Sequence, residues 1–317
     1  MREAVFVKQN TEKWAEFEKQ STQNPDVLSE RFIELTDDLS FARTFYPDSQ
    51  VTRYLNGLTS QFHRQLYGNK PEKQNRFILF WKEELPTLFY ESHRQLLNAF
   101  LIFFGACLIG AVSEAYDDTF VRLILGDTYV NQTLENIDKG DPLAIYKSQD
   151  QVSMYFAITY NNIRVAFITF VMGITFSIGT AYFLFVNGIM LGAFQYFFFQ
   201  KGFLLKSVLT IWVHGTLEIS AIVIAGCAGL VMGNSLLFSK TFSRSISFQK
   251  GAKQGLKIAL GLVPIFMTAG FLESFVTRLS LHPLVSGSII AVSASFIVWY
   301  FVIYPIKLNK LRALSFE

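Results

Sequence analysis

The chain has 317 residues, of which 51% are hydrophobic and 33 are phenylalanine, and its formal net charge is +3. This apolar excess excludes an ordinary soluble protein, and so small a net charge gives no reason to expect nucleic-acid binding. Charged residues are concentrated before residue 95, which predicts a polar N-terminal part and a membrane-embedded remainder. Cys107 and Cys227 lie in apolar stretches and offer no disulfide framework.

Residues 1–95 are expected to form a small cytoplasmic helical domain. No apolar stretch follows the first basic residues, so we expect an uncleaved N-terminus in the cytoplasm. Apolar residues recur at helical spacing around Trp14, between Asp26 and Pro47, and again after Asp48, which is the expected cap of the third helix. The domain has 13 basic and 14 acidic residues, so it presents no strong electrostatic surface.

Residues 71–95 connect this domain to the membrane. The run Phe77-Ile78-Leu79-Phe80-Trp81 has Arg76 and Lys82 at its edges, which is typical of a helix lying in the membrane interface. Ordinary packing against the soluble domain explains the same pattern equally well.

The region from 96 to 306 is predicted to be an all-α, polytopic bundle surrounded by membrane lipids. A bilayer requires about 20 apolar residues for each spanning helix. Six spans fit the sequence: 96–116, 163–186, 187–202, 215–238, 258–276 and 286–306.

Charge sets the expected orientation of the bundle. The loop at 117–162 holds seven acidic and three basic residues, whereas 239–257 holds five basic residues and no acidic one. Positive residues favour the cytoplasmic side, which places 239–257, the N-terminus and the tail 307–317 inside the cell. A helical segment at 119–134 is expected to cover the outer mouth of the bundle. A re-entrant hairpin over 188–215 is the alternative to two crossings there, and would change the orientation downstream.

An ionisable pair lies in one of the most apolar stretches, within His214-Gly215-Thr216-Leu217-Glu218. A charged group at membrane depth costs roughly 2.5–3.5 kcal/mol, so such groups face the bundle interior and pair. Residues four apart share a helix face, and we therefore expect His214 and Glu218 to contact each other.

Other polar and small residues accompany this pair. Asn187-Gly188 interrupts the preceding apolar run, and Glu273 is a second buried carboxylate with Arg278 as its expected partner. Small residues spaced by four let membrane helices approach closely, within one chain or across a symmetric homodimer. The residues with this spacing are Ala225, Gly229 and Gly233.

Several chemical roles suit the pair. A zinc site needs three or four protein ligands, and the pair supplies two, with Asn187, Glu273 and His282 as further candidates that the sequence does not bring together. Histidine changes charge near neutral pH, so a proton relay is another role. The structural alternative is that the pair holds a helix that breaks at Gly215. We predict no metal, no cofactor and no enzymatic activity, because no phosphate loop, nucleophile elbow or cysteine cluster is present.

Several stretches carry a resemblance to a known family. They are Ala42-Arg43-Thr44-Phe45-Tyr46-Pro47, Tyr54-Leu55-Asn56, His63, Glu84-Leu85-Pro86, Gly179-Thr180, Asn187-Gly188, and His214-Gly215 with Glu218 and the glycine-rich helix behind it. With these the chain resembles the stage II sporulation protein M family of integral membrane proteins, in particular longer members with an added cytoplasmic domain. The N-terminal 95 residues and the long acidic loop depart from the family's namesake.

The resemblance implies a membrane scaffold. The namesake acts with partners that degrade peptidoglycan during engulfment, and genes for longer members often lie near those for RDD-type membrane proteins and MoxR-type ATPases. We therefore expect a scaffold of an envelope complex. The alternatives are a transporter or lipid-handling protein that uses the His/Glu pair for coupling, and an intramembrane hydrolase, for which no catalytic set is visible.

Overall fold

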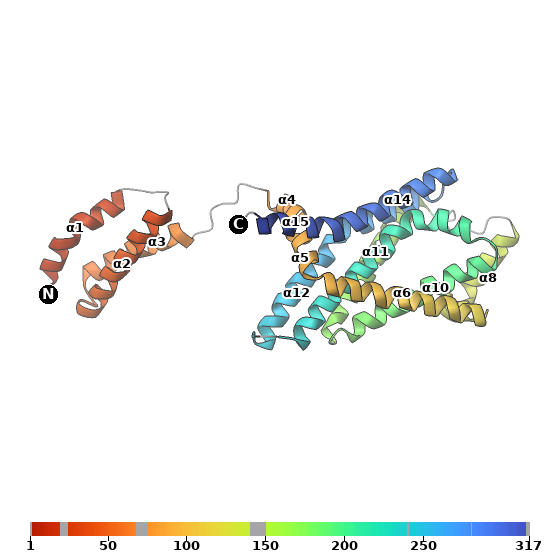
Figure 1. Cartoon of the computed structure of the whole chain (residues 1–317), viewed down its shortest axis with the longest axis horizontal. Coiled ribbons are helices and arrows are strands. Elements are labelled where there is room, and N and C mark those ends of the chain that lie inside the picture. Colours follow the sequence, from red (N-terminus) through yellow and green to blue (C-terminus); the bar gives the residue numbers. More distant parts are fainter. Residues whose placement is uncertain are drawn as a thin grey trace. The chain divides into compact units, whose positions relative to one another are not determined.

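The computed structural model describes residues 2–19, 25–67, 75–139, 150–239, 241–279 and 281–314, and its regular elements within these ranges are all helices (Figure 1). The chain divides into two compact units, Met1–Asn75 and Arg76–Glu317. The all-α prediction is thereby confirmed for the described residues. The unit boundary falls before residue 76, earlier than the predicted residue 95.

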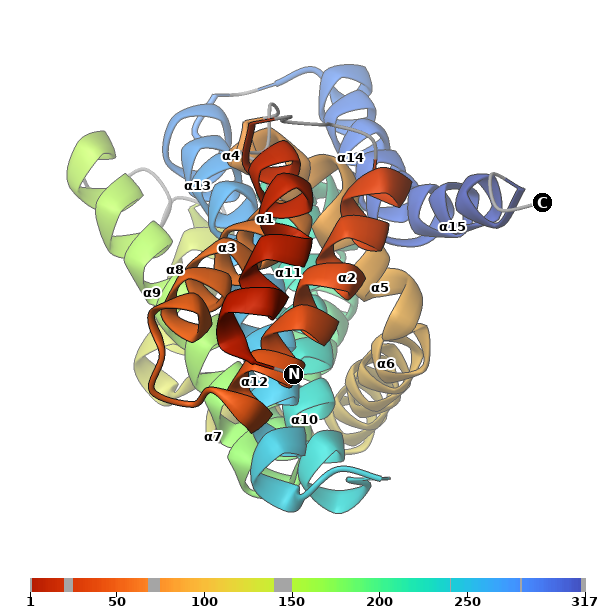
Figure 2. The same ribbon diagram turned by 90° about the vertical axis from the view of Figure 1, so that its left-hand side faces the viewer.

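The N-terminal unit consists of α1 (Glu3–Lys19), α2 (Pro25–Phe45) and α3 (Gln50–Tyr67), which Figure 2 shows from one end of the chain. The Trp14 indole N–H donates to Asp38 Oδ2 at 2.8 Å and ties α1 to α2. Ser49, not Asp48, caps α3, because its hydroxyl accepts from the Thr52 N–H at 3.2 Å. The residues that form the core of this unit include Phe6, Trp14, Leu28, Leu35, Leu39, Ala42, Val51, Leu55, Leu58 and Phe62.

The segment that follows belongs to the membrane unit. It comprises α4 (Arg76–Leu79), the π-helical turn η1 (Phe80–Glu84) and α5 (Leu85–Glu91). The Tyr300 hydroxyl donates to the Trp81 carbonyl at 2.7 Å, and Arg312 Nη2 pairs with Glu83 Oε2 at 2.7 Å. These bonds attach the segment to the C-terminal end of the bundle.

Six helical stretches among the described residues are long and apolar enough to cross a membrane, as predicted. They are α6 (His93–Tyr116), α9 with η3 (Gln151–Val171, Met172–Ile174), α10 (Ile178–Gln200), α11 (Leu204–Leu237), α12, α13 and η4 (Arg244–Gly261, Val263–Phe271, Leu272–Val276), and α14, η5 and α15 (Pro283–Val298, Trp299–Ile303, Tyr304–Leu314).

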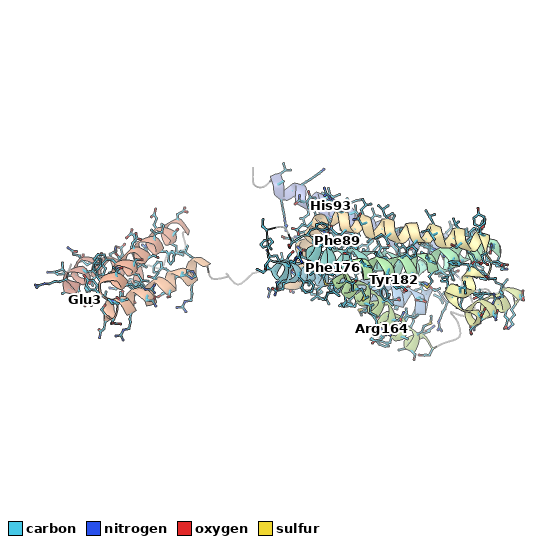
Figure 3. All side chains as sticks on the ribbon, turned by 90° about the horizontal axis from the view of Figure 1, so that it is seen from below. Glu3, Phe89, His93, Arg164, Phe176 and Tyr182 are labelled. Carbon is cyan, nitrogen blue, oxygen red and sulfur yellow. The ribbon has the colours of Figure 1, made fainter. Side chains whose placement is uncertain are left out.

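The turn between the second and third spans differs from the prediction. We expected it at Asn187-Gly188, but α10 continues through both residues. The chain reverses just before α10, where Phe176 (φ 56°) and Ser177 (φ 70°) adopt the left-handed conformation, and Figure 3 labels Phe176. Gly188 serves packing instead, because a Cβ there would overlap the Phe103 carbonyl and the Ala106 side chain of α6.

The fourth span is longer than predicted. α11 begins at Leu204 and runs without interruption through Gly215, so the re-entrant hairpin and the break at Gly215 are both wrong. A Cβ at Gly215 would meet only the Ile211 side chain, at 3.8 Å. Gly215 therefore has no visible packing role, and the true turn lies at Gly202 (φ 78°).

α11 is the central helix of the membrane unit. It contacts α6, α9, α10, α12, α13 and α14, and Figure 1 shows it inside the bundle. Its small residues lie against the second and third spans within the chain: a Cβ at Gly229 would overlap the Thr180 hydroxyl, and one at Gly233 would overlap Ser177. Ala225 is fully buried.

The loop after the first span is partly helical. α7 (Phe120–Leu125) and α8 (Asp127–Asp138) pack through Val121 and Val130 onto Phe197 and Phe198 of α10. The expected single helix is divided at Gly126 (φ 83°). The loop ends at Asp150, before the predicted residue 162, and its carboxylate accepts from the Ser153 N–H at 2.9 Å. This bond holds the pKa of Asp150 below its usual range.

Candidate functional site

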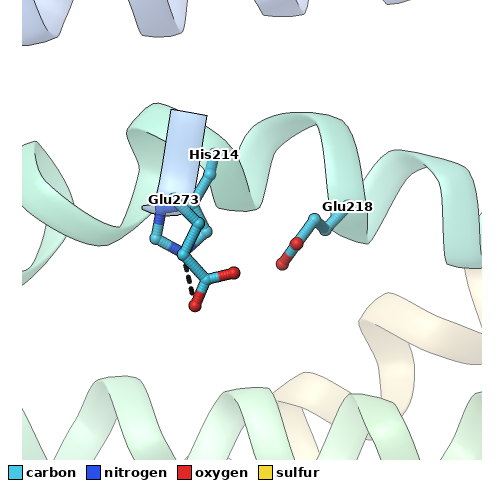
Figure 4. A group of neighbouring side chains, drawn as sticks. All are labelled: His214, Glu218 and Glu273. Carbon is cyan, nitrogen blue, oxygen red and sulfur yellow. Dashed lines mark ion pairs between the residues drawn. The ribbon is translucent and has the colours of Figure 1, made fainter. Parts of the chain in front are cut away.

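Three ionisable side chains converge in the membrane unit: His214 and Glu218 from α11, and Glu273 from the π-helical turn η4 (Figure 4). One ligand-type atom from each lies within 4.8 Å of the other two. His214 Nε2 stands 3.9 Å from Glu273 Oε1. His214 is 3% exposed, and the Glu273 side chain is 13% exposed.

Each member of this cluster has a partner from another element. His214 Nδ1 lies 2.9 Å from Thr277 Oγ1, and the Thr277 hydroxyl donates to the Leu272 carbonyl at 3.1 Å. Asn162 of α9 donates from Nδ2 to Glu218 Oε1 at 2.5 Å. The cluster therefore connects α9, α11 and η4.

α9 also packs closely against α13 and η4 beside the bond from Asn162 to Glu218. Thr159, one turn before Asn162, lies against Gly270, where a Cβ would overlap the Thr159 hydroxyl. That hydroxyl is buried and has no hydrogen-bond partner in the described part of the chain. Gly270 thus allows the two elements to approach closely one turn from Glu273.

The sequence placed His214 and Glu218 on one face, and the structure places them there with Glu273. Glu273 faces His214, while Arg278, its predicted partner, directs Nη2 to Met154 Sδ at 3.2 Å. His282 is not part of the cluster; its Nδ1 accepts from the Leu284 N–H at 3.3 Å at the start of α14.

Asn187 and Gly188 lie away from the cluster, on α10. Asn187 Nδ2 donates to the Phe183 carbonyl of its own helix at 2.8 Å, and Gly188 packs against α6. The sequence analysis missed Asn162 and Thr277. The available signal for Asn162 was the Asn161-Asn162 pair inside an otherwise apolar span.

A cation on the surface of α9 is a second unusual feature. Arg164 is exposed, thirteen residues after α9 begins, which is about 20 Å along the helix. Figure 3 shows it at the edge of the membrane unit, pointing outward. Within the described residues Arg164 makes no hydrogen bond or ion pair. Its neighbours on the same face, Tyr160 and Val171, are 69% and 51% exposed.

An apolar groove of about 700 Å³ lies on the other side of α11. Its lining includes Phe89 and His93, which Figure 3 labels, and Thr216 of α11, Phe301 and Ala294. Thr216 is about 200° around the helix from His214, so the groove and the cluster use opposite faces of α11.

Two family models match the chain. No curated protein and no solved structure matches it. The model described as Domain of unknown function (DUF8413) matches residues 4–68, which cover the three helices of the N-terminal unit. The model described as Stage II sporulation protein M matches residues 99–278, more than half of the chain. That match begins in α6 and ends just after η4, so it contains the whole cluster. The chain is thus a multi-pass membrane protein that belongs to the stage II sporulation protein M family.

Proposed function

We propose that this protein is a non-enzymatic membrane scaffold of a cell-envelope assembly, and that it recruits a partner membrane protein through the exposed face of α9. The observation that supports this proposal is Arg164. A cation on the lipid-facing side of a span costs roughly 2.5–3.5 kcal/mol, and membrane proteins usually place such groups opposite a partner. A partner helix with a carboxylate at the same depth would remove that cost.

The chemistry of this face favours a different protein over a second copy. A symmetric dimer through the face would bring two Arg164 side chains together, because a twofold interface uses the same patch on both subunits. Like charges in a low-dielectric setting repel strongly. A partner span with an acidic residue, as an RDD-type or other envelope membrane protein could provide, is the better complement.

The burial of His214 also supports a scaffold more than a transporter. Transport by His214 and Glu218 would require a path for water or substrate to His214. His214 is buried, and the groove residues lie on the opposite face of α11. The cluster instead links three elements, as a fixed structural core requires.

The test is the variant Arg164→Leu, purified from native membranes after cross-linking. We expect it to lose the acidic partner while becoming more stable as an isolated chain, because the charge no longer faces lipid. Val171→Ala on the same helix is the control and should retain the partner. Unchanged partners in Arg164→Leu would rule out this face as the recruitment site.

The groove supports a second candidate function, the binding of a lipid acyl chain. Its volume lies in the range of about 300–1,000 Å³ that is typical of small-molecule sites, and its lining is largely apolar. Ala294→Trp should fill the groove and reduce copurified lipid. Val292→Trp, on the same helix at a residue that is 69% exposed, is the control. Equal lipid in both variants would exclude a lipid site in the groove.

A further inference from the structure

We infer that His214, Glu218 and Glu273 bind a divalent transition-metal cation inside the membrane unit, and that Zn²⁺ fits the site best. This inference does not depend on the scaffold proposal. Three ligand-type atoms lie within 4.8 Å of one another. Two ligands of a tetrahedral Zn²⁺, each at about 2.0–2.2 Å from the ion, lie roughly 3.3–3.6 Å apart, so each pair of these atoms would have to close by at most about 1.5 Å.

Thr277 orients the imidazole of His214. The Thr277 hydroxyl has one proton, which it donates to the Leu272 carbonyl. His214 Nδ1 lies 2.9 Å from the same hydroxyl oxygen, and in the tautomer with its proton on Nδ1 it donates to Thr277. That tautomer has its lone pair on Nε2, the nitrogen that faces Glu273.

The separation of His214 and Glu273 is close to that of two ligands on one cation. His214 Nε2 and Glu273 Oε1 are 3.9 Å apart, which is too long for a hydrogen bond. It is within about 0.6 Å of the roughly 3.3–3.6 Å that separates two ligands of a tetrahedral Zn²⁺. Thr277 then has the role typical of a group that orients a metal-binding histidine through its second nitrogen.

Charge points to the same ligand. Glu218 and Glu273 bring two carboxyl groups close together in a largely buried site with one imidazole. Two negative charges there are balanced by one divalent cation, which avoids the cost of burying unpaired charge. Asn162 holds the Glu218 carboxylate through the 2.5 Å bond.

The donor set selects the kind of metal. One imidazole nitrogen with carboxylate oxygens suits Zn²⁺ and its transition-metal neighbours, whereas Mg²⁺ and Ca²⁺ prefer oxygen ligands throughout. The ligands come from α11 and η4, and Asn162 comes from α9. A bound ion would therefore join α11 and η4 directly, and α9 through the bond from Asn162 to Glu218.

The test is metal analysis of the full chain purified in detergent, followed by chelation and return of Zn²⁺. We expect about one equivalent of metal per chain, a fall in melting temperature after chelation, and recovery with Zn²⁺. Substituted Co²⁺ should give a visible ligand-field spectrum. Glu273→Gln should lose both the metal and the spectrum, and Asn162→Leu should weaken Zn²⁺ binding about 10–100-fold.

Glu114→Gln is the matched control. Glu114 is also fully buried in the bundle, but it accepts from the Val121 N–H at 2.6 Å, outside the cluster. The Glu114→Gln variant should keep the full metal content of the wild-type chain. The proposal would be overturned if the wild-type chain contained no metal and its melting temperature changed with neither chelator nor Zn²⁺. That result would indicate a proton shared within the cluster instead. Equal metal in wild type and Glu273→Gln would also overturn it, as adventitious binding.

Discussion

Asn162 and Glu218 meet between α9 and α11, and their bond is a direct polar link between these two spans. Glu218→Gln keeps a hydrogen-bonding group of similar size, so we expect the fold to survive. Glu218→Leu leaves Asn162 without its acceptor and should lower the free energy of unfolding by about 1–3 kcal/mol. Because the residues are coupled, Asn162→Leu combined with Glu218→Leu should cost less than the sum of the single changes in a thermal-stability assay.

Asn187 provides the control for this comparison of single and double variants. It is also an asparagine in a membrane helix, but it bonds to its own helix at the Phe183 carbonyl. Asn187→Leu and Glu218→Leu should therefore be additive. Additivity of the Asn162 pair as well would mean that the bond contributes nothing to stability.

At the scale of the helical element, the glycines of α11 differ in their surroundings. A Cβ at Gly229 would overlap the Thr180 hydroxyl and the Thr169 carbonyl, whereas one at Gly215 would make an ordinary contact. Gly229→Ala should lower stability by about 1–3 kcal/mol through overpacking. Gly215→Ala should leave stability unchanged or raise it by up to about 1 kcal/mol, because alanine favours helix. Thermal melts of both variants in one detergent compare them directly, and a costly Gly215→Ala would contradict this account of α11.

Element boundaries also show what the sequence could reveal. Long apolar stretches gave the correct number of spans, because a bilayer sets their minimum length. The turn at Phe176 and Ser177 left no signal, since neither residue is glycine or proline. Asn187-Gly188 misled the prediction because a glycine that admits a neighbouring helix looks in sequence like one that ends a helix.

The site was predictable in part for a similar reason. Ionisable groups are rare in spans, so His214, Glu218 and Glu273 stand out in the sequence. Asn162 and Thr277 do not, because neutral polar residues are common in membrane helices and each partner lies more than 50 positions away along the chain. Only the fold brings them to the cluster.

At the scale of the whole molecule, we predict that both termini lie in the cytoplasm. An even number of crossings keeps the two ends of the membrane unit on one side, and the basic residues of 239–257 favour the inside. In intact cells a membrane-impermeant maleimide should label Thr128→Cys, on the exposed side of α8, and leave Ser245→Cys unlabelled. The reverse pattern would invert the topology.

The exposed Arg164 has a consequence for the supply of the protein in the cell. In a copy without its proposed partner, the Arg164 cation faces lipid, and this lowers the stability of the chain. Cells continuously remove such marginal chains by proteolysis, and a change of one or two kcal/mol is enough to alter abundance several-fold. The steady-state amount of this protein should therefore follow the amount of its partner, and Arg164→Leu should release it from that dependence.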